Sequence, residues 1–275
     1  MRPETKIESH RFEALGTSCS LFSAGRPLGR LVEGELWVRQ VGARFTRFSA
    51  QSELSRLNAS AGRWVEVGED MEALLRDALR AYATSGGLVN VAVLPSMMAT
   101  GYTRPISQGP TVAVLELAHP PPALPDVLQV REGEARLEPG AGLDLGGVAK
   151  GWMADRLCAW LGPNVLANLG GDLMATGVGP AGDGWPVGLA GVTVMLRDQG
   201  AATSSVRRRR WGDMHHLIDP RTGLPGSTGL EEVSVVASSG FEAEVVAKTA
   251  LLLGPDLAPT YCAAHALAWW LGGSQ

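Results

Sequence analysis

The sequence predicts a fold that mixes α-helices with β-strands, and two kinds of pattern support this expectation. In some stretches apolar residues recur at helical spacing, whereas in shorter stretches they alternate or cluster between glycines. The expected helices cover residues 28–48, 71–85, 149–160 and 243–254. The expected strands cover residues 11–23 with a break at Gly16-Thr17, 127–137, 165–174, 186–189, 192–197 and 201–207.

Length and composition are those of an ordinary globular protein. The chain has 275 residues, of which 45% are hydrophobic and 19% are charged, and its formal net charge is −4. This charge gives no reason to expect a nucleic acid or an anionic membrane as the partner. We expect residues 1–275 to form one domain, with a proline-rich excursion on its surface near residues 104–126. For the run Arg207–Arg210, which lacks interleaved aromatic residues, a solvated strand edge is favoured over a phosphate contact.

The cellular compartment is indicated by the first residues and by the cysteines. The opening stretch lacks the apolar core of a signal peptide, and no later stretch is long enough to span a bilayer. We therefore expect a cytoplasmic protein without membrane insertion. The residues Cys19, Cys158 and Cys262 are odd in number and far apart in the sequence, which indicates neither a disulfide framework nor a clustered metal site.

The central stretch Leu143–Arg156 combines an acid, two glycines and a lysine. It predicts a short apolar strand ending at Asp144, a turn at Gly146-Gly147 and a helix with Lys150 in its first turn. Adjacent glycines let backbone N–H groups approach a ligand, and a helix start adds unpaired donors and a partial positive charge. This corner therefore suits an anion, with Asp144 placed to accept hydrogen bonds from a sugar or a base edge. The alternative is a plain strand-to-helix connection.

Some polar residues have a structural interpretation. Ser52 and Asp70 are placed to cap the helices that follow them, and Asn58 is placed to end a short helix. Asn90 interrupts an apolar stretch that predicts a strand or a buried loop. A lone asparagine in such a stretch is more often a satisfied buried amide than a ligand group.

Two adjacent histidines precede a turn. Neighbouring residues on a strand point to opposite faces, so His215 and His216 cannot form a metal pair at one site. Asp219–Gly223 has the proline and the glycine typical of a turn. A histidine just before such a turn is well placed as a general base, because an imidazole titrates near neutral pH. A solvated histidine at a strand end is the alternative.

The late helix over residues 243–254 is apolar on nearly all sides, which predicts burial. Glu244 and Lys248 lie four residues apart and hence on one face of it. On an exposed helix this would be a minor ion pair. On a buried helix an acid and an amine are costly unless they face each other or a polar ligand, so we favour a functional site.

The order of these segments resembles the ApbE-like FAD:protein FMN transferases. Six motifs of that family have counterparts in the same order between about Ala14 and Gly254. They are Gly16-Thr17, Ser52–Asn58, Gly101-Tyr102, Asp144–Gly151, Asn168–Asp172 and His216–Gly223. Each motif alone is only weakly or moderately specific, and the ordered set carries the resemblance.

The resemblance implies a mixed α/β (α+β) fold, similar to the T-fold, with sheets and packed helices around a flavin cleft. It implies that FAD is cleaved at its diphosphate and that FMN passes to a Thr or Ser hydroxyl of an acceptor flavoprotein, with release of AMP. Phosphoryl transfer of this kind depends on positioning and positive charge. His216 matches the histidine that acts as catalytic base in the family. The implied FAD contacts are Leu15, Phe48, Leu88, Val89, Asn90, Asp144, Lys150 and Ile218.

The chain departs from the family pattern where the family binds Mg²⁺. That pattern uses an Asp and a Thr four residues later on the late helix, together with a carbonyl of the Gly-Gly turn. The matching residues here are Gly147, Glu244 and Lys248. Glutamate can bind Mg²⁺ but lysine cannot, and the Lys248 ammonium could take the place and the charge of the metal. Asn90 also replaces a family aspartate.

These departures leave two alternatives to the transferase. The first is an FAD pyrophosphatase of the same fold, in which water replaces the acceptor hydroxyl and the products are FMN and AMP. The second is an FAD-binding module without turnover, which Asn90 and Lys248 favour.

Overall fold

The computed structural model describes residues 6–273, which divide into two compact units. Unit 1 contains residues 6–42, 149–204 and 230–273, and unit 2 contains residues 43–148 and 205–229. Neither unit is one continuous stretch of chain, and the expectation of a single domain over residues 1–275 stays a prediction.

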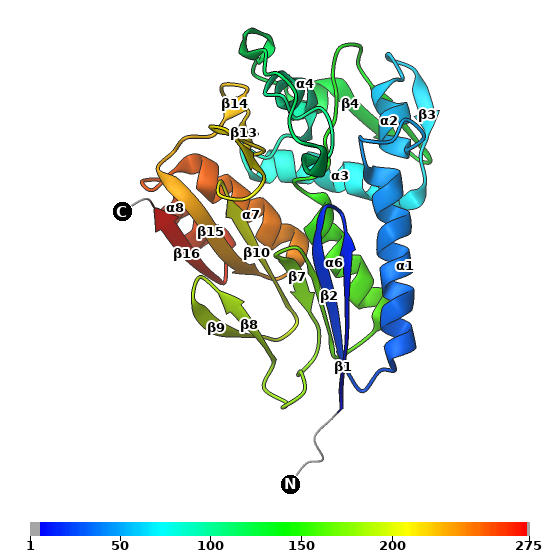
Figure 1. Cartoon of the computed structure of the whole chain (residues 1–275), viewed down its shortest axis with the longest axis vertical. Coiled ribbons are helices and arrows are strands. Elements are labelled where there is room, and N and C mark those ends of the chain that lie inside the picture. The colour runs from blue at the N-terminus through cyan, green and yellow to red at the C-terminus, as the bar shows by residue number, and fades with distance from the viewer. Residues whose placement is uncertain (1–5, 274–275) are drawn as a thin grey trace. The chain divides into compact units, whose positions relative to one another are not determined.

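Unit 1 is built on a sheet of seven strands in the order β1-β2-β6-β7-β10-β15-β16 (Figure 1). The expected first strand is a hairpin whose arms pair from Ile7↔Ala24 to Ala14↔Thr17. The expected strand over residues 165–174 is also a hairpin, because Gly170 and Gly171 turn the chain with positive φ. The strands are β1 (Ile7–Ala14), β2 (Thr17–Ala24), β6 (Val165–Leu169), β7 (Asp172–Ala175), β10 (Gln199–Ser205), β15 (Leu230–Ala237) and β16 (Ala268–Gly273).

Helices cover one face of this sheet. Figure 1 shows α6 (Ala149–Leu161) and α7 (Gly240–Leu253) side by side against the strands. The helix α8 (Ala258–His265) follows α7, and α1 (Leu28–Phe45) begins in this unit. As expected, α7 is buried along most of its length.

The opposite face of the sheet packs against a two-stranded hairpin, β8 (Trp185–Leu189) with β9 (Val192–Leu196). Trp185 and Leu196 of the hairpin share an apolar cluster with Leu166 and Leu173 of the sheet. Side chains alternate across a strand, so burial on both faces of the sheet explains why every residue of β6 except Asn168 is apolar.

Unit 2 contains shorter elements. A three-stranded sheet in the order β3-β5-β4 and two small hairpins accompany its helices. Its helices are α2 (Glu53–Asn58), α3 (Glu69–Thr84), α4 (Leu94–Ala99) and α5 (Leu124–Val127), with 3₁₀ turns η1 (Val91–Val93), η2 (Ile106–Gln108) and η3 (Leu115–Leu117). Its strands are β3 (Trp64–Glu66), β4 (Leu128–Arg131), β5 (Glu134–Leu137), β11 (Arg210–Trp211), β12 (Met214–His215), β13 (Ile218–Asp219) and β14 (Leu224–Pro225).

Two local expectations in unit 2 are wrong, and a third that was left open is decided. Asp70 does not cap α3, because Gly68 is the N-cap and Asp70 pairs with Arg44 at 2.9 Å. The stretch before Asp144 joins no sheet, since a side-chain amide and a loop carbonyl bind its backbone in place of a neighbouring strand. The stretch over residues 88–95 was expected to be a strand or a buried loop, and it forms a buried loop, a 3₁₀ turn and the start of α4.

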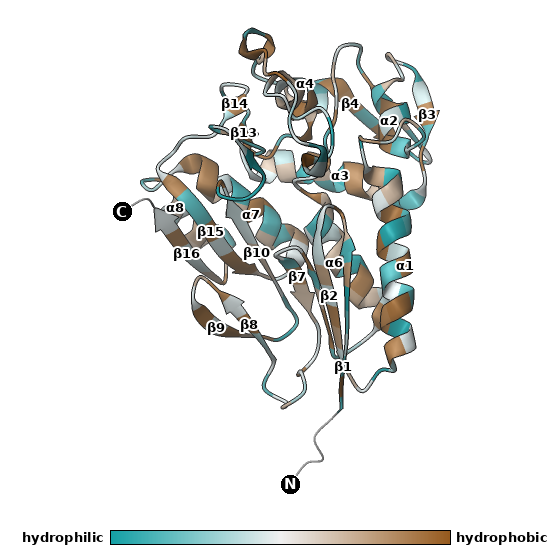
Figure 2. Cartoon of the chain, viewed as in Figure 1, coloured by the Kyte–Doolittle hydropathy of each residue, from teal (hydrophilic) through white to brown (hydrophobic). Residues whose placement is uncertain are grey.

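Residues 104–126 carry exposed apolar side chains. Val112 is 86% exposed and Leu117 is 62% exposed, and Figure 2 shows the apolar colouring of this stretch. Among the described residues, no helix has both the length and the apolar character needed to cross a bilayer.

Candidate functional site

The residues predicted for the site divide between the two units. Unit 1 holds four of them, namely Leu15, Lys150, Glu244 and Lys248. Unit 2 holds the others, namely Phe48, Leu88, Val89, Asn90, Asp144, Gly147, His216 and Ile218.

In unit 1 the ammonium of Lys150 lies between two buried carboxylates. Lys150 is in the first turn of α6, as expected, and its Nζ contacts Asp172 at the start of β7 and Glu244 Oε1 of α7, the latter at 3.2 Å. The side chain of Lys150 is 15% exposed, and those of Asp172 and Glu244 are each 5% exposed. We call these three residues the carboxylate–lysine cluster. The sequence had given no role to Asp172.

The second oxygen of Glu244 is also occupied. Glu244 Oε2 accepts a hydrogen bond from the backbone N–H of Gly151 at 2.9 Å. The helices α6 and α7 approach closely at this contact. A Cβ on Gly151 would lie 2.3 Å from the carbonyl oxygen of Gly240, so a larger residue would not fit there. Glycine at position 151 therefore places Glu244 beside Lys150.

The start of α7 is fixed by an acid of α6. Asp155 accepts hydrogen bonds from the backbone N–H groups of Gly240 at 2.6 Å and Phe241 at 2.9 Å. Burial raises the pKa of Asp155 to about 6, while these two N–H donors oppose the increase. Asp155 thus sets the position of the helix that carries Glu244 and Lys248.

Leu15 lies at the turn between β1 and β2. It has a positive φ of 55°, and its side chain packs so close to Gly42 that a Cβ there would lie 2.6 Å away. Gly170 has a similar role, because a Cβ on it would lie 2.4 Å from the side chain of Thr17. The two glycines let the β1–β2 turn pack tightly against α1 and the β6–β7 turn.

In unit 2, Asp144 is held by three groups. Its carboxylate accepts hydrogen bonds from Arg47 Nε at 2.5 Å and from the Gly146 N–H at 2.8 Å, and its own N–H donates to the Val91 carbonyl at 2.8 Å. The preceding residue, Leu143, exchanges two hydrogen bonds with the side-chain amide of Asn58, at 2.8 and 3.0 Å. Asn58 ends α2, as expected, and it also fixes the segment that carries Asp144.

Arg47 joins Asp144 to an aromatic cluster. Its guanidinium lies 4.2 Å from the ring centroid of Phe48 and 4.7 Å from that of Tyr102, and it donates to the Tyr102 carbonyl at 2.7 Å. The Tyr102 and Trp211 rings are 5.1 Å apart, and burial raises the pKa of the Tyr102 hydroxyl. Phe48 is 40% exposed, so it offers a ring face at the edge of this cluster.

Ile218 belongs to the same apolar surroundings. It is buried with Tyr102 and Met97, and Trp211 packs against them. The indole N–H of Trp211 donates to the Thr100 carbonyl at 2.7 Å, which ties β11 to the end of α4. The structure therefore brings together three of the predicted FAD contacts, Phe48, Asp144 and Ile218. Arg47 and Tyr102 lie between them and contact them.

The two histidines were expected on one strand, but β12 ends at His215 and His216 follows it in a bend. His215 is buried, and both nitrogens of its ring form hydrogen bonds with the backbone. Nδ1 accepts from the Leu217 N–H at 3.2 Å, and Nε2 donates to the Gly226 carbonyl at 2.9 Å. This neutral ring fixes the turn that follows, and burial lowers the pKa of His215. His216 is half-buried in the bend between β12 and β13.

The remaining predicted contacts of unit 2 are buried. Leu88 and Val89 are buried in the loop after α3. The Asn90 amide donates to the Pro122 carbonyl and accepts from the Ala92 N–H, both at 2.9 Å. Asn90 is thus a satisfied buried amide that holds the loop, and its predicted contact with FAD stays a prediction.

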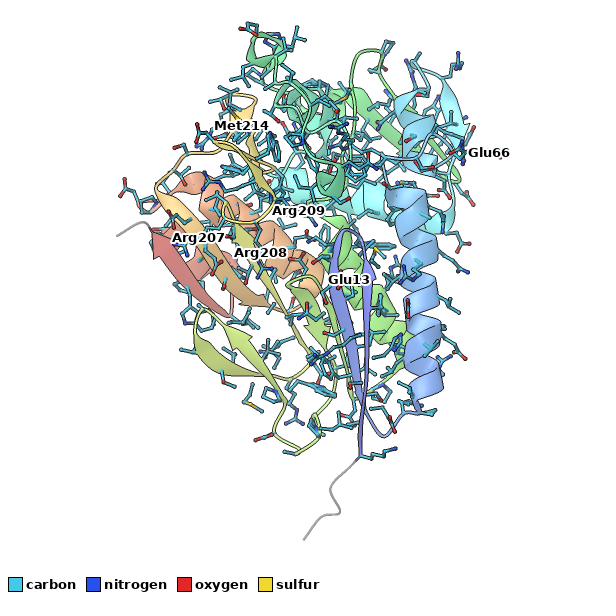
Figure 3. All side chains as sticks on the ribbon, viewed as in Figure 1. Glu13, Glu66, Arg207, Arg208, Arg209 and Met214 are labelled. Carbon is cyan, nitrogen blue, oxygen red and sulfur yellow. The ribbon has the colours of Figure 1, made fainter. Side chains whose placement is uncertain are left out.

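Three residues of the arginine run, Arg207–Arg209, lie in a turn, and Arg210 begins β11. Strand β10 ends at Ser205, and Arg207 and Arg208 are exposed in the turn that follows (Figure 3). Arg209 has a positive φ of 49°, and its charge lowers the pKa of Tyr102 against the larger effect of burial.

The predicted donors for Mg²⁺ do not form a fitting set. Both oxygens of Glu244 are engaged, one by the Lys150 ammonium and one by the Gly151 N–H. Lys248 offers a second ammonium one helical turn further on and no oxygen. Across residues 6–273, no three His, Cys, Asp or Glu side chains form a group suited to a metal ion.

Comparisons with known proteins place the chain in a family. The sequence model of the ApbE family matches residues 15–270. A FAD:protein FMN transferase from Haemophilus influenzae is 26% identical over 266 residues, covering 87% of this chain and 77% of that protein. Another from Treponema pallidum is 28% identical over 252 residues, covering 74% of this chain and 65% of that protein.

The fold is likewise that of solved ApbE structures. The ApbE protein from Thermotoga maritima matches with a TM-score of 0.86 at 21% identity, covering 98% of this chain and 96% of that one. The apo flavinyl transferase ApbE from Pseudomonas stutzeri matches with a TM-score of 0.85 at 20% identity, covering 98% and 92%. The chain belongs to the ApbE family, and the expected mixed α/β fold is confirmed.

Proposed function

We propose that this chain is an FAD:protein FMN transferase. The observation that carries the proposal is the family match over residues 15–270, which includes the motifs of Lys150 and His216. Curated relatives along most of the chain bear the name of this activity. The substrates are FAD and an acceptor flavoprotein with a Ser or Thr hydroxyl.

His216 is the general base of the proposed reaction. The acceptor hydroxyl oxygen attacks the phosphorus on the FMN side of the diphosphate and forms the new P–O bond. The bond from this phosphorus to the bridging oxygen breaks, and AMP leaves with its electron pair. His216 takes the hydroxyl proton, a role for which an imidazole is suited near neutral pH. The neutral ring of His215 positions the segment that carries His216.

The unit 2 cluster contributes to FAD binding. The half-exposed ring of Phe48 offers a flat face for an aromatic ring of FAD, and Arg47 and Tyr102 support it from the protein side. Arg47 and Gly146 hold the carboxylate of Asp144 in one orientation. The carboxylate can therefore accept a hydrogen bond from FAD without a further loss of side-chain entropy. Leu15, Lys150, Ile218 and the segment 88–90 are proposed as further contacts.

The proposal is tested by the products formed from FAD. The chain is incubated with FAD alone and with candidate acceptor flavoproteins, each beside a variant with alanine at its acceptor hydroxyl. A transferase releases AMP and binds flavin covalently to the acceptor only when the hydroxyl is present. Equal release of AMP and free FMN without any acceptor indicates the pyrophosphatase, and intact FAD in every mixture indicates a binding module.

The role of His216 is tested in the same assay. His216→Ala keeps FAD binding but loses transfer by a factor of about 10²–10⁴, because general-base catalysis contributes that much. His119→Ala is the matched control, since His119 is exposed in the same unit and the proposal gives its ring no role. Transfer by His216→Ala at the rate of the parent chain would refute the assignment.

A further inference from the structure

The carboxylate–lysine cluster of unit 1 has a charge pattern of its own. Asp172 and Glu244 supply two negative charges, and the Lys150 ammonium contacts both of them. The two carboxylate side chains are each only 5% exposed. Burial of this kind requires that the negative charges be compensated nearby.

A second ammonium comes from α7 itself. Lys248 is half-buried and lies four residues after Glu244, on the same face of the helix. With all four side chains ionised, Asp172, Glu244, Lys150 and Lys248 carry no net charge. The two lysine side chains thus supply all of the positive charge that balances the two carboxylates, without a metal ion.

A divalent cation would upset this balance. Mg²⁺ beside Glu244 would add two positive charges to a group that is already neutral, and it would have to displace the Lys150 ammonium or the Gly151 N–H from the carboxylate oxygens. A neutral hydroxyl at position 248 would instead leave one negative charge uncompensated. A group with one uncompensated negative charge favours the binding of a cation.

We infer that Lys150 and Lys248 supply the positive charge at this cluster and that the chain works without bound Mg²⁺. The inference rests on the proposed function where it concerns turnover. Its first part concerns metal binding alone and is tested separately. Lys248 is the residue that decides between an internal ammonium and an external metal ion.

Metal binding is measured by titrating the FAD-free full chain with MgCl₂ in a calorimeter, and with MnCl₂ by electron paramagnetic resonance. The parent chain and Lys248→Arg, which keeps the charge, are expected to bind neither ion at this cluster. Lys248→Thr removes the charge and adds a hydroxyl oxygen, so it is expected to bind both. Binding of Mg²⁺ by the parent chain overturns the inference whether or not the variants fold. Failure of a folded Lys248→Thr to bind either ion also overturns it.

Turnover is measured in the same proteins with excess EDTA. We expect transfer of FMN by the parent chain to be unchanged by EDTA, and transfer by Lys248→Thr to fall by about tenfold or more and to recover with MgCl₂. Loss of transfer by the parent chain in EDTA, restored by MgCl₂, contradicts the inference. If metal binding follows the expected pattern but no protein transfers flavin under any condition, the proposed function fails and the assignment of the charges stands.

Discussion

Replacement of Lys150 by methionine tests whether the carboxylate–lysine cluster is held together by its ammonium. Methionine keeps a flexible apolar chain of similar length and removes the charge. Asp172 and Glu244 then face each other with side chains that are 5% exposed and without the cation that contacts both. The perturbation therefore leaves two buried acids with Lys248 as the remaining cation of the group.

The expected loss of stability is large. Removing one partner from a buried ion pair costs about 3–5 kcal/mol, because an uncompensated charge stays in the interior. The Gly151 N–H still donates to Glu244, so we expect a value near the lower end, about 3 kcal/mol. A loss of this size is a considerable part of the roughly 5–15 kcal/mol that stabilises a typical protein.

The assay is urea unfolding of the FAD-free protein, followed by tryptophan fluorescence. In the folded variant, a proton bound by one of the two carboxylates removes their mutual repulsion. The loss of unfolding free energy relative to the parent chain should therefore become smaller at acid pH. Lys6→Met is the control, since Lys6 is 84% exposed and pairs with Glu8, and it should unfold like the parent chain. If Lys150→Met unfolds at the same urea concentration as Lys6→Met, the cluster is not held by its ammonium.

Three further predictions concern the packing and the charges around the site. Gly151→Ala should lower the free energy of unfolding by about 1–3 kcal/mol, because its Cβ would lie 2.3 Å from the Gly240 carbonyl oxygen, and an unchanged urea midpoint would contradict this. Burial lowers the pKa of His215 below its ordinary value of 6.5, so its stabilising contribution is present above that pH and is lost as the pH falls through the folded-state pKa. Titration of the ring by NMR checks this, and a pKa at or above 6.5 would be inconsistent with the buried neutral ring. Arg47→Met should weaken FAD binding by about tenfold, since Asp144 loses a charged hydrogen bond, and a flavin fluorescence titration with the affinity of the parent chain would count against its role.

The regular elements could be predicted because their signals are local. Apolar periodicity indicated α1, α6 and α7, and short apolar stretches indicated β8, β9 and β10. The stretch at Leu143 is not a strand, because its backbone pairs with the Asn58 side chain, 85 residues away in the sequence. Periodicity carries no information about such a partner.

The candidate site was predictable only in part for the same reason. Motif order indicated Lys150, Asp144 and His216 one at a time. It could not show that Lys150 meets Glu244 across 94 residues or that Arg47 meets Asp144 across 97. Sequence signals for these partners exist: Asp172 closes a Gly-Gly turn, and Arg47 directly precedes Phe48. They gain meaning only when the fold brings the segments together.

The most direct test of the account is the intact mass of an acceptor flavoprotein after incubation with this chain and FAD. We predict a mass increase equal to FMN less one water, together with one AMP released for each acceptor modified. The increase should be absent when alanine replaces the acceptor hydroxyl or His216. AMP release without any change in the mass of the acceptor would contradict the transferase and leave hydrolysis of FAD as the activity.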